Sequence, residues 1–304
     1  MNKVIMIMVD GFGMPPAGLH CPVYSNCCTP EFLELLEHHS TPIDANLDTP
    51  GLPQSATGQC SLFCGINAAA AINRHLPGFP NAILRKIIRE QNIFKSLIAL
   101  GAKVTFANAY VNHTLEELKH SGLRSVTTVM TDSEIGQVRN RHDLLNGQAV
   151  LHDITREYLT GALNHLGLSK RMATLTPVLN SELAITPEQA AHDLLTVATE
   201  NDFTLFEFFM SDRAGHRQHE PLLKHVLMNL SRFVGELCST MDDSVTLLLT
   251  ADHGNCEDIT VKSHTRNPVP LMIYRNSGPV IPAIKSITEV HGLTVKLVTD
   301  LSPC

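Results

Sequence analysis

Three apolar segments of the chain each end in an aspartate, and histidines follow two of these acids. The six residues are Asp10, Asp212, His216, Asp252, His253 and His264. Continuous apolar segments of this length predict buried strands of a parallel sheet. Ligands of open α/β sheets gather outside the carboxyl ends of the strands. We therefore expect the six side chains to meet at one edge of the sheet.

Three carboxylates and three imidazoles in one place need a counter-charge. Like charges close together are costly unless a cation holds them. Two divalent ions about 3.5–4 Å apart would use such a set of ligands. Taken singly, an aspartate after a strand is usually a turn or cap residue, and a histidine is usually an ordinary surface or core group. Because the six occur together after successive strands, the sequence favours a metal centre.

A hydroxyl that could act with such metals lies in the segment 52–59. Ser55 and Thr57 stand where a loop enters a helix, and the first-turn N–H groups of a helix attract phosphate. A metal-bound hydroxyl loses its proton readily enough to attack phosphorus. Ordinary helix capping is the alternative interpretation of the same residues.

The composition narrows the class of protein. The chain has 304 residues, of which 43% are hydrophobic and 17% charged, so it can bury the core of one large or two modest domains. No apolar run approaches the roughly 20 residues that span a bilayer. A net charge of −7 argues against nucleic-acid and anionic-membrane partners. We expect neither partner.

The cysteines and the first residues indicate a cytoplasmic protein with reduced thiols. The eight cysteines form no CxxC pair, and the apolar run before Asp10 is too short for the core of a signal peptide. A metal or redox site at Cys21, Cys27 and Cys28 is left open.

Alternating helices and short apolar strands predict a parallel sheet covered by helices on both faces. The expected strands are Val4–Val9, Lys103–Asn108, Phe203–Met210, Val245–Thr250 and Val269–Tyr274. The first expected helix begins near Thr29. Five further helices are expected at about Ser55–Ala71, Asn81–Glu90, Asn92–Leu100, Thr186–Glu200 and Pro221–Thr240. Residues 41–53 are expected to form turns, and residues 109–185 show no sustained period.

The motifs resemble those of the alkaline phosphatase superfamily, most closely the branch of cofactor-independent phosphoglycerate mutase and phosphopentomutase. They are VDGFG at 9–13, the segment around Ser55, SDRAGH at 211–216, TADHGN at 250–255 and SHTRNPVP at 263–270. The resemblance covers about residues 1–108 and 186–280. It implies an α/β fold, an alkaline-phosphatase-like three-layer α/β/α sandwich with a mostly parallel central sheet. The metal-binding core would comprise 1–108 and 186–304, and 109–185 would be a small cap-like insertion.

The resemblance also implies roles for the site residues. One divalent ion would be held by Asp212, His216 and His264. The other would be held by Asp10, Asp252, His253 and the Ser55 hydroxyl. Zn²⁺ and Mn²⁺ both suit these ligands. Ser55 would attack phosphorus and form a phosphoserine, with Thr57 as the second choice of nucleophile.

Two departures from the mutase pattern concern the substrate. The chain has no room for the large substrate domain that follows the nucleophile helix of the mutase, and the neighbours of Ser55 are Gln54 and Gln59 in place of Asn and His. Four arginines near the motifs could clamp a phosphate or carboxylate: Arg74, Arg213, Arg217 and Arg266. Surface ion pairs are the alternative for each of them.

The sequence therefore predicts a two-metal phosphohydrolase or phosphotransferase that acts through Ser55 on a small phosphorylated metabolite. An intramolecular phosphomutase is one alternative. A catalytically inactive, metal-binding regulatory protein is another. The substrate, the choice between hydrolase and mutase, the metals, the role of residues 109–185 and the oligomeric state are left open.

Overall fold

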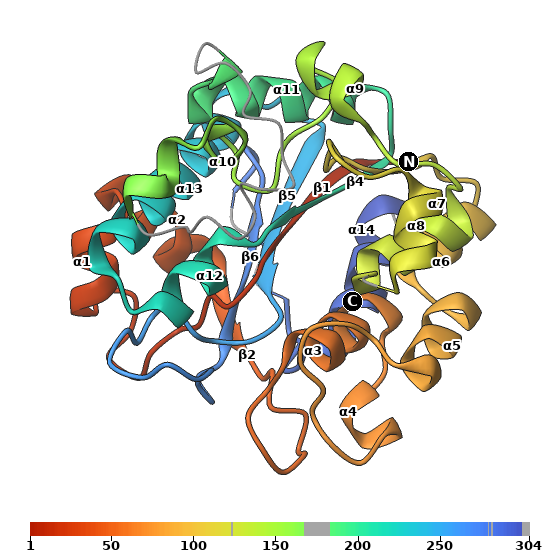
Figure 1. Cartoon of the computed structure of the whole chain (residues 1–304), viewed down its shortest axis with the longest axis horizontal. Helices are drawn as coiled ribbons and strands as arrows, with labels where there is room; N and C mark the ends of the chain where they lie inside the picture. The colour runs from red at the N-terminus through yellow and green to blue at the C-terminus, as the bar shows by residue number, and fades with distance from the viewer. Residues whose placement is uncertain (123, 167–182, 279, 281, 300–304) are drawn as a thin grey trace.

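Six strands form one central sheet in the computed structural model of the chain (Figure 1). They are β1 (Lys3–Val9), β2 (Ser40–Ile43), β3 (Val104–Phe106), β4 (Phe203–Phe208), β5 (Val245–Ala251) and β6 (Val269–Tyr274). Their order across the sheet is β2-β6-β5-β1-β4-β3. The adjacent strands β5, β1, β4 and β3 are parallel, while β6 runs antiparallel to both β5 and β2. The sheet is thus mixed and mostly parallel, as predicted.

The structure describes residues 1–122, 124–166, 183–278, 280 and 282–299. Helices lie on both sides of the sheet (Figure 1), which confirms the three-layer arrangement. One layer contains α1 (Pro22–Cys27), α2 (Pro30–His39), α11 (Pro187–Thr199), α12 (Met210–Arg217) and α13 (Glu220–Thr240). The other contains α3 (Ser55–Cys64), α4 (Ala68–Ala71), α5 (Ala82–Glu90), α6 (Ile93–Ala99), α8 (Val126–Glu134) and α14 (Val290–Thr299).

The central strands are apolar because helices cover both faces. Every residue of β4 and β5 is buried, and so are all residues of β1 after Lys3. Several helices begin at the residues that the sequence indicates, since side chains there accept hydrogen bonds from first-turn N–H groups. These caps are Thr29, Asn81, Asn92 and Thr186.

Two expected elements differ from the structure. The single helix expected over Ser55–Ala71 is two helices, because Gly65 takes the left-handed conformation (φ 67°) that ends α3, and Asn67 then caps α4. The turn segment 41–53 contains part of β2, which pairs with β6 at the edge of the sheet. Pro42 is tolerated there because an edge strand does not need every N–H.

The segment 109–185 contains α7 (Leu115–Ser121), α8, α9 (Arg141–Leu145), α10 (Glu157–Thr160) and the 3₁₀ helix η1 (Ala162–Leu166) among its described residues. Of these, α8 lies against α5 and α6 in the helical layer. A small separate apolar cluster includes Leu144, Leu151 and Leu159. The division into core and cap stays a prediction. No helix of the described part of the chain is long and apolar enough to cross a membrane.

Candidate metal centre

The register of the central strands places the three aspartates together at the carboxyl-terminal edge of the sheet. Val9, the last residue of β1, pairs with Phe208 of β4 on one side and with Ala251 of β5 on the other. Asp10 and Asp252 directly follow their strands, and Asp212 lies in the first turn of α12 after β4. Parallel strands that end together present the residues after them at the same edge.

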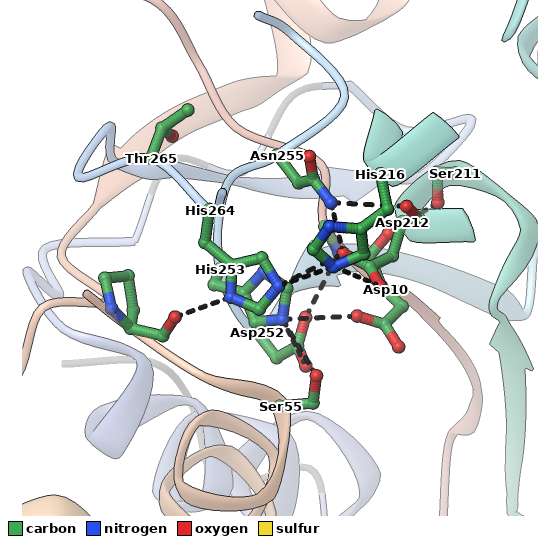
Figure 2. A network of polar contacts seen from close by, with 12 residues as sticks. Asp10, Ser55, Ser211, Asp212, His216, Asp252, His253, Asn255, His264 and Thr265 are labelled. Carbon is green, nitrogen blue, oxygen red and sulfur yellow. Dashed lines mark hydrogen bonds and ion pairs between the residues drawn. The ribbon is translucent and has the colours of Figure 1, made fainter. Parts of the chain in front are cut away.

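The first predicted ligand group comes together around Asp212. Its carboxylate oxygens lie 3.4 Å from His216 Nε2 and 3.4 Å from His264 Nε2. The two imidazole Nε2 atoms are 3.1 Å apart. Each ring is oriented through Nδ1, which lies 2.7 Å from the Pro53 carbonyl in His264 and 2.8 Å from the Lys262 carbonyl in His216. Both Nε2 atoms are thereby directed to the centre of the cluster (Figure 2).

The second predicted group comes together around His253, which is fully buried. Its Nε2 lies 3.3 Å from Asp10 Oδ1, 3.6 Å from Asp252 Oδ2 and 3.0 Å from Ser55 Oγ (Figure 2). Ligand atoms of Asp10, Asp252 and His253 lie within 4.8 Å of one another. His253 also comes within 4.8 Å of ligand atoms of Asp212 and His264, so it lies between the two groups.

Without a cation, the pKa values of these groups are pulled in opposite directions. Burial raises the pKa of Asp10 well above its usual range, and the charges of Asp252 and Asp212 raise it further. Burial also raises the pKa of Asp252 and lowers that of His253. Burial opposes charge on Asp212 too, but hydrogen bonds with His216 and His264 bring its pKa below the usual value.

The residues present fit divalent cations. Asp10 Oδ1 and His253 Nδ1 are buried and have no hydrogen-bond partner in the described part of the chain. Three carboxylates and three imidazoles without a thiolate form the mixed oxygen and nitrogen donor set that zinc and manganese accept. A bound cation would offset the like charges that raise the pKa values of the buried acids.

The two candidate nucleophiles lie in different environments. Ser55 begins α3, is partly exposed, and directs its Oγ to His253. Thr57 is fully buried, donates its hydroxyl hydrogen bond to the Gln54 carbonyl (3.1 Å) and accepts one from the Leu76 N–H (3.2 Å). The Thr57 hydroxyl is thus used within the fold, whereas the Ser55 hydroxyl is among the candidate ligands.

A cavity of about 420 Å³ opens beside this cluster. Asp10, Ser55 and Asp212 line it, together with Arg213. Of the four arginines predicted to bind substrate, Arg213 alone lines this cavity. The Arg266 guanidinium donates to the Gly51 carbonyl instead, and neither Arg74 nor Arg217 is among the residues that form the cavity wall.

Side chains outside the predicted set of site residues hold the ligands in place. Asn255 Nδ2 donates to Asp212 Oδ1 (2.5 Å), and Gln59 Nε2 donates to Asp252 Oδ2 (3.1 Å). Buried Glu257 accepts from the N–H groups of Gly13 (3.0 Å) and Asn255 (2.8 Å), tying the loop after β1 to the loop after β5. Asn255 is the last residue of the TADHGN motif, and this position was the one feature of the sequence that could have indicated its role in the site.

The cysteine site left open by the sequence gains no support from the geometry. Cys21, Cys27 and Cys28 are all buried free thiols. Burial raises the pKa of Cys28 to about 12, which disfavours the thiolate that metal binding or redox chemistry uses.

Three of the motifs, SDRAGH, TADHGN and SHTRNPVP, lie inside a segment that matches a known family. Residues 179–293 match the family model described as the Metalloenzyme superfamily. A phosphopentomutase of Levilactobacillus brevis is 38% identical over 80 residues, which is 25% of this chain and 20% of the relative. A 2,3-bisphosphoglycerate-independent phosphoglycerate mutase of Cyanothece sp. is 34% identical over 96 residues, 29% of this chain and 17% of the relative. The chain therefore aligns with about a fifth of the length of these relatives.

The fold also has solved counterparts. The alkaline phosphatase from the Antarctic bacterium TAB5 superposes with a TM-score of 0.54 at 14% sequence identity, covering 98% of each chain. At this identity the similarity concerns the fold alone. Together with the sequence matches, it confirms the resemblance to the alkaline phosphatase superfamily and to the mutases in the core motifs.

Proposed function

We propose that this chain is a metal-dependent phosphoryl-transfer enzyme: a two-metal phosphohydrolase or phosphotransferase that acts on a small phosphorylated metabolite. One observation carries the proposal. Ser55 is the first residue of α3, and its hydroxyl oxygen lies 3.0 Å from His253 Nε2 within the cluster of six acids and imidazoles. The same residue lines the cavity of about 420 Å³. A nucleophile, a cation-binding donor set and space for a substrate thus occur together.

The six acids and imidazoles, together with the Ser55 hydroxyl, would hold two divalent ions, Zn²⁺ or Mn²⁺. Bound ions of this kind stabilise negative charge on phosphate oxygens and lower the pKa of a nearby hydroxyl. The residues that would hold them are Asp10, Ser55, Asp212, His216, Asp252, His253 and His264.

Side chains and the main chain would carry out the nucleophilic attack and the binding of the phosphate. Ser55 Oγ attacks phosphorus, so an Oγ–P bond forms while the bond between phosphorus and the leaving alcohol breaks. The Ser55 hydroxyl gives up one proton, and the departing alkoxide takes up one proton and leaves as the alcohol. Water or a second hydroxyl then takes the phosphoryl group and frees Ser55. The N-terminal end of α3 favours the negative charge of the phosphate, and Arg213 on the same wall can pair with a phosphate oxygen.

An intramolecular phosphomutase is the second candidate, favoured by the two relatives that carry mutase names. In that case the phosphoserine returns its phosphoryl group to another hydroxyl of the same substrate. Turnover in ¹⁸O-labelled water separates the two reactions. A hydrolase releases phosphate that contains solvent oxygen, whereas a mutase releases essentially no phosphate and yields an isomeric phosphate ester.

The direct test uses metal-supplemented protein, a panel of phosphomonoesters and the variant Ser55→Ala. We expect turnover by the wild type and its loss in the variant. Equal turnover by both proteins would eliminate Ser55 as the nucleophile. Metal-dependent binding without turnover of any ester would instead identify the catalytically inactive, metal-binding protein.

A further inference from the structure

The cavity beside Ser55 extends from the candidate metal centre toward β3, the edge strand on that side of the sheet. Its wall includes Phe106 at the end of β3 and Phe209 after β4. Phe79 comes from the loop between α4 and α5, and Ala109 and Tyr110 follow β3. Three phenylalanines, one tyrosine ring and one alanine thus line a single cavity, an apolar wall that suits the body of a small organic ligand.

Asn108 belongs to this wall, and its amide bonds to the main chain of β4. Its Nδ2 donates to the Glu207 carbonyl (2.7 Å), and its Oδ1 accepts from the Glu207 N–H (2.8 Å). Both ends of the amide are therefore occupied by the main chain of β4, so Asn108 acts as a structural link between β4 and the segment after β3.

The hydroxyls on the wall bond to one another. Tyr110 Oη lies 2.7 Å from Thr128 Oγ1, which in turn lies 2.9 Å from Ser125 Oγ. Ser125 also caps α8 by accepting the Thr128 N–H (3.1 Å). These two bonds use two of the three hydroxyl hydrogens, so this part of the wall has at most one left to donate to a ligand. A ligand bond gained by breaking an internal one yields little net free energy.

His152 supplies one polar position on the same wall. Its Nε2 is buried and has no hydrogen-bond partner among the described residues. Burial and the nearby Arg213 charge lower the pKa of His152 to about 3, so the ring is neutral at physiological pH. A neutral imidazole can donate or accept one hydrogen bond but adds no charge.

Phe79 is the part of the wall most available to a ligand. The residue is 46% exposed, and the neighbouring Gly78 lies in the left-handed region (φ 67°). A single exposed aromatic residue is common on a surface. This one stands on the wall of the cavity that also contains Ser55 and Arg213, where a bound ring could cover it.

We propose that the preferred substrates are phosphomonoesters whose alcohol part is a planar, largely apolar ring that packs on Phe79. This inference rests on the proposed function. The phosphate would lie at Ser55 and Arg213, and the ring would occupy the apolar part of the cavity, with His152 as its polar contact. Polyhydroxylated phosphate esters would be poorer substrates, because the Asn108 and Gln59 amides and most hydroxyl hydrogens of the apolar part already bond within the protein.

The test compares three esters of primary alcohols, so that the intrinsic reactivity of the leaving group is similar. Benzyl phosphate carries the ring, and glycerol 3-phosphate and ribose 5-phosphate carry hydroxyls. With metal-supplemented wild-type protein we expect kcat/KM for benzyl phosphate to exceed the other two values by roughly tenfold or more, as expected when an aromatic ring is largely buried.

Phe79→Ala should lower the ratio of kcat/KM for benzyl phosphate to that for glycerol 3-phosphate by roughly tenfold. Phe79→Leu keeps apolar bulk without the ring and should lower the ratio less. Ile83→Ala is the matched control, since Ile83 is a nearby exposed apolar residue of α5 outside the cavity wall. This control should leave the ratio unchanged.

A binding measurement separates this inference from the proposed function. Benzylphosphonate and methylphosphonate cannot be hydrolysed, and calorimetric titration of the metal-supplemented protein gives their affinities. We expect tighter binding of benzylphosphonate and loss of that advantage in Phe79→Ala. If no ester is turned over but this pattern holds, the ring site stands and the proposed reaction fails. Turnover with no preference for benzyl phosphate and no effect of Phe79→Ala overturns the ring site alone.

Discussion

Ser55 Oγ lies 3.0 Å from His253 Nε2, although the two residues are 198 positions apart in the chain. The contact joins the first residue of α3 to the residue that follows Asp252 at the end of β5. His253 is also 3.3 Å from Asp10. The Ser55 hydroxyl is therefore held where three chain segments meet, and its environment differs from that of Thr57 two residues later.

Ser55→Ala is expected to lower turnover of phosphomonoesters by at least about a thousandfold, because removal of a nucleophile leaves only binding and electrostatic effects. The fold should persist, since the partly exposed Ser55 side chain contributes little to packing. Thermal unfolding and steady-state kinetics on the same preparations check both statements.

Thr57→Val is the matched variant for this prediction. It removes a buried hydroxyl that bonds Gln54 and Leu76 and keeps the side-chain volume. We expect a loss of about 1–3 kcal/mol in the free energy of unfolding, with activity retained. An active Ser55→Ala together with an inactive, stable Thr57→Val would assign the nucleophile to Thr57.

Removal of divalent ions is expected to destabilise the protein. A ligand at a thousandfold its Kd stabilises the folded state by about 4 kcal/mol, so a chelator should lower Tm by several degrees. His216→Ala should reduce this chelator-dependent shift, because His216 Nε2 lies 3.1 Å from His264 Nε2 within the cluster. His192→Ala, an exposed histidine on α11 paired with Glu236, should leave the shift unchanged. A Tm that does not respond to chelator would contradict a metal centre.

Gly58→Ala is expected to damage the site through the backbone. A Cβ at Gly58 would lie 2.6 Å from the Asp252 carbonyl oxygen, and a main-chain atom cannot rotate away as a side chain can. The variant must push α3 away from β5, at a cost of about 1–3 kcal/mol in the free energy of unfolding. Metal affinity should fall too, because Ser55 and His253 would separate. Titration with metal and denaturant unfolding measure the two effects.

Gly235→Ala in the middle of α13 is the control for this variant, because nothing lies within 4 Å of its added Cβ. Replacing an unobstructed helical glycine by alanine should stabilise the protein by up to about 1 kcal/mol. Equal behaviour of the two variants would mean that the close approach of α3 to β5 is not needed.

The sequence was most informative where each strand ends. Asp10 and Asp252 directly follow continuous apolar runs, so their common position at the sheet edge could be predicted from strand direction alone. The shared position of His253 between the two ligand groups could not, because it depends on distances between side chains. The bond between His264 and the Pro53 carbonyl joins residues 211 positions apart, and no local pattern encodes such a pair.

The secondary structure of residues 109–185 could not be predicted from the sequence for a different physical reason. The helices described there are short, from four to nine residues, so no long apolar period develops. Two of them, α7 and α9, begin with a capping box formed by neighbouring residues. His152 and Tyr110 reach the cavity wall from this segment without any motif around them. These two cavity-lining positions are set by tertiary contacts, which no local sequence pattern encodes.

The last prediction concerns Glu207, a fully buried carboxyl on β4. Thr127 Oγ1 donates to its Oε2 (2.7 Å), while its Oε1 has no hydrogen-bond partner in the described part of the chain. Burial raises the pKa of Glu207 from 4.5 to about 8. Between these two pH values the folded state holds a proton that the unfolded state has released, so the free energy of unfolding should fall as pH rises, with a slope of up to about 1.4 kcal/mol per pH unit from this group.

Glu207→Gln removes this titration and keeps the shape of the protonated side chain and an acceptor for Thr127. In the presence of chelator, the variant and the wild type should differ progressively between pH 5 and 8, with Glu207→Gln becoming relatively more stable as pH rises. Urea unfolding at several pH values measures the difference. Parallel stability curves would mean that Glu207 is ionised in the folded protein, because a carboxyl that releases its proton equally in both states adds no slope.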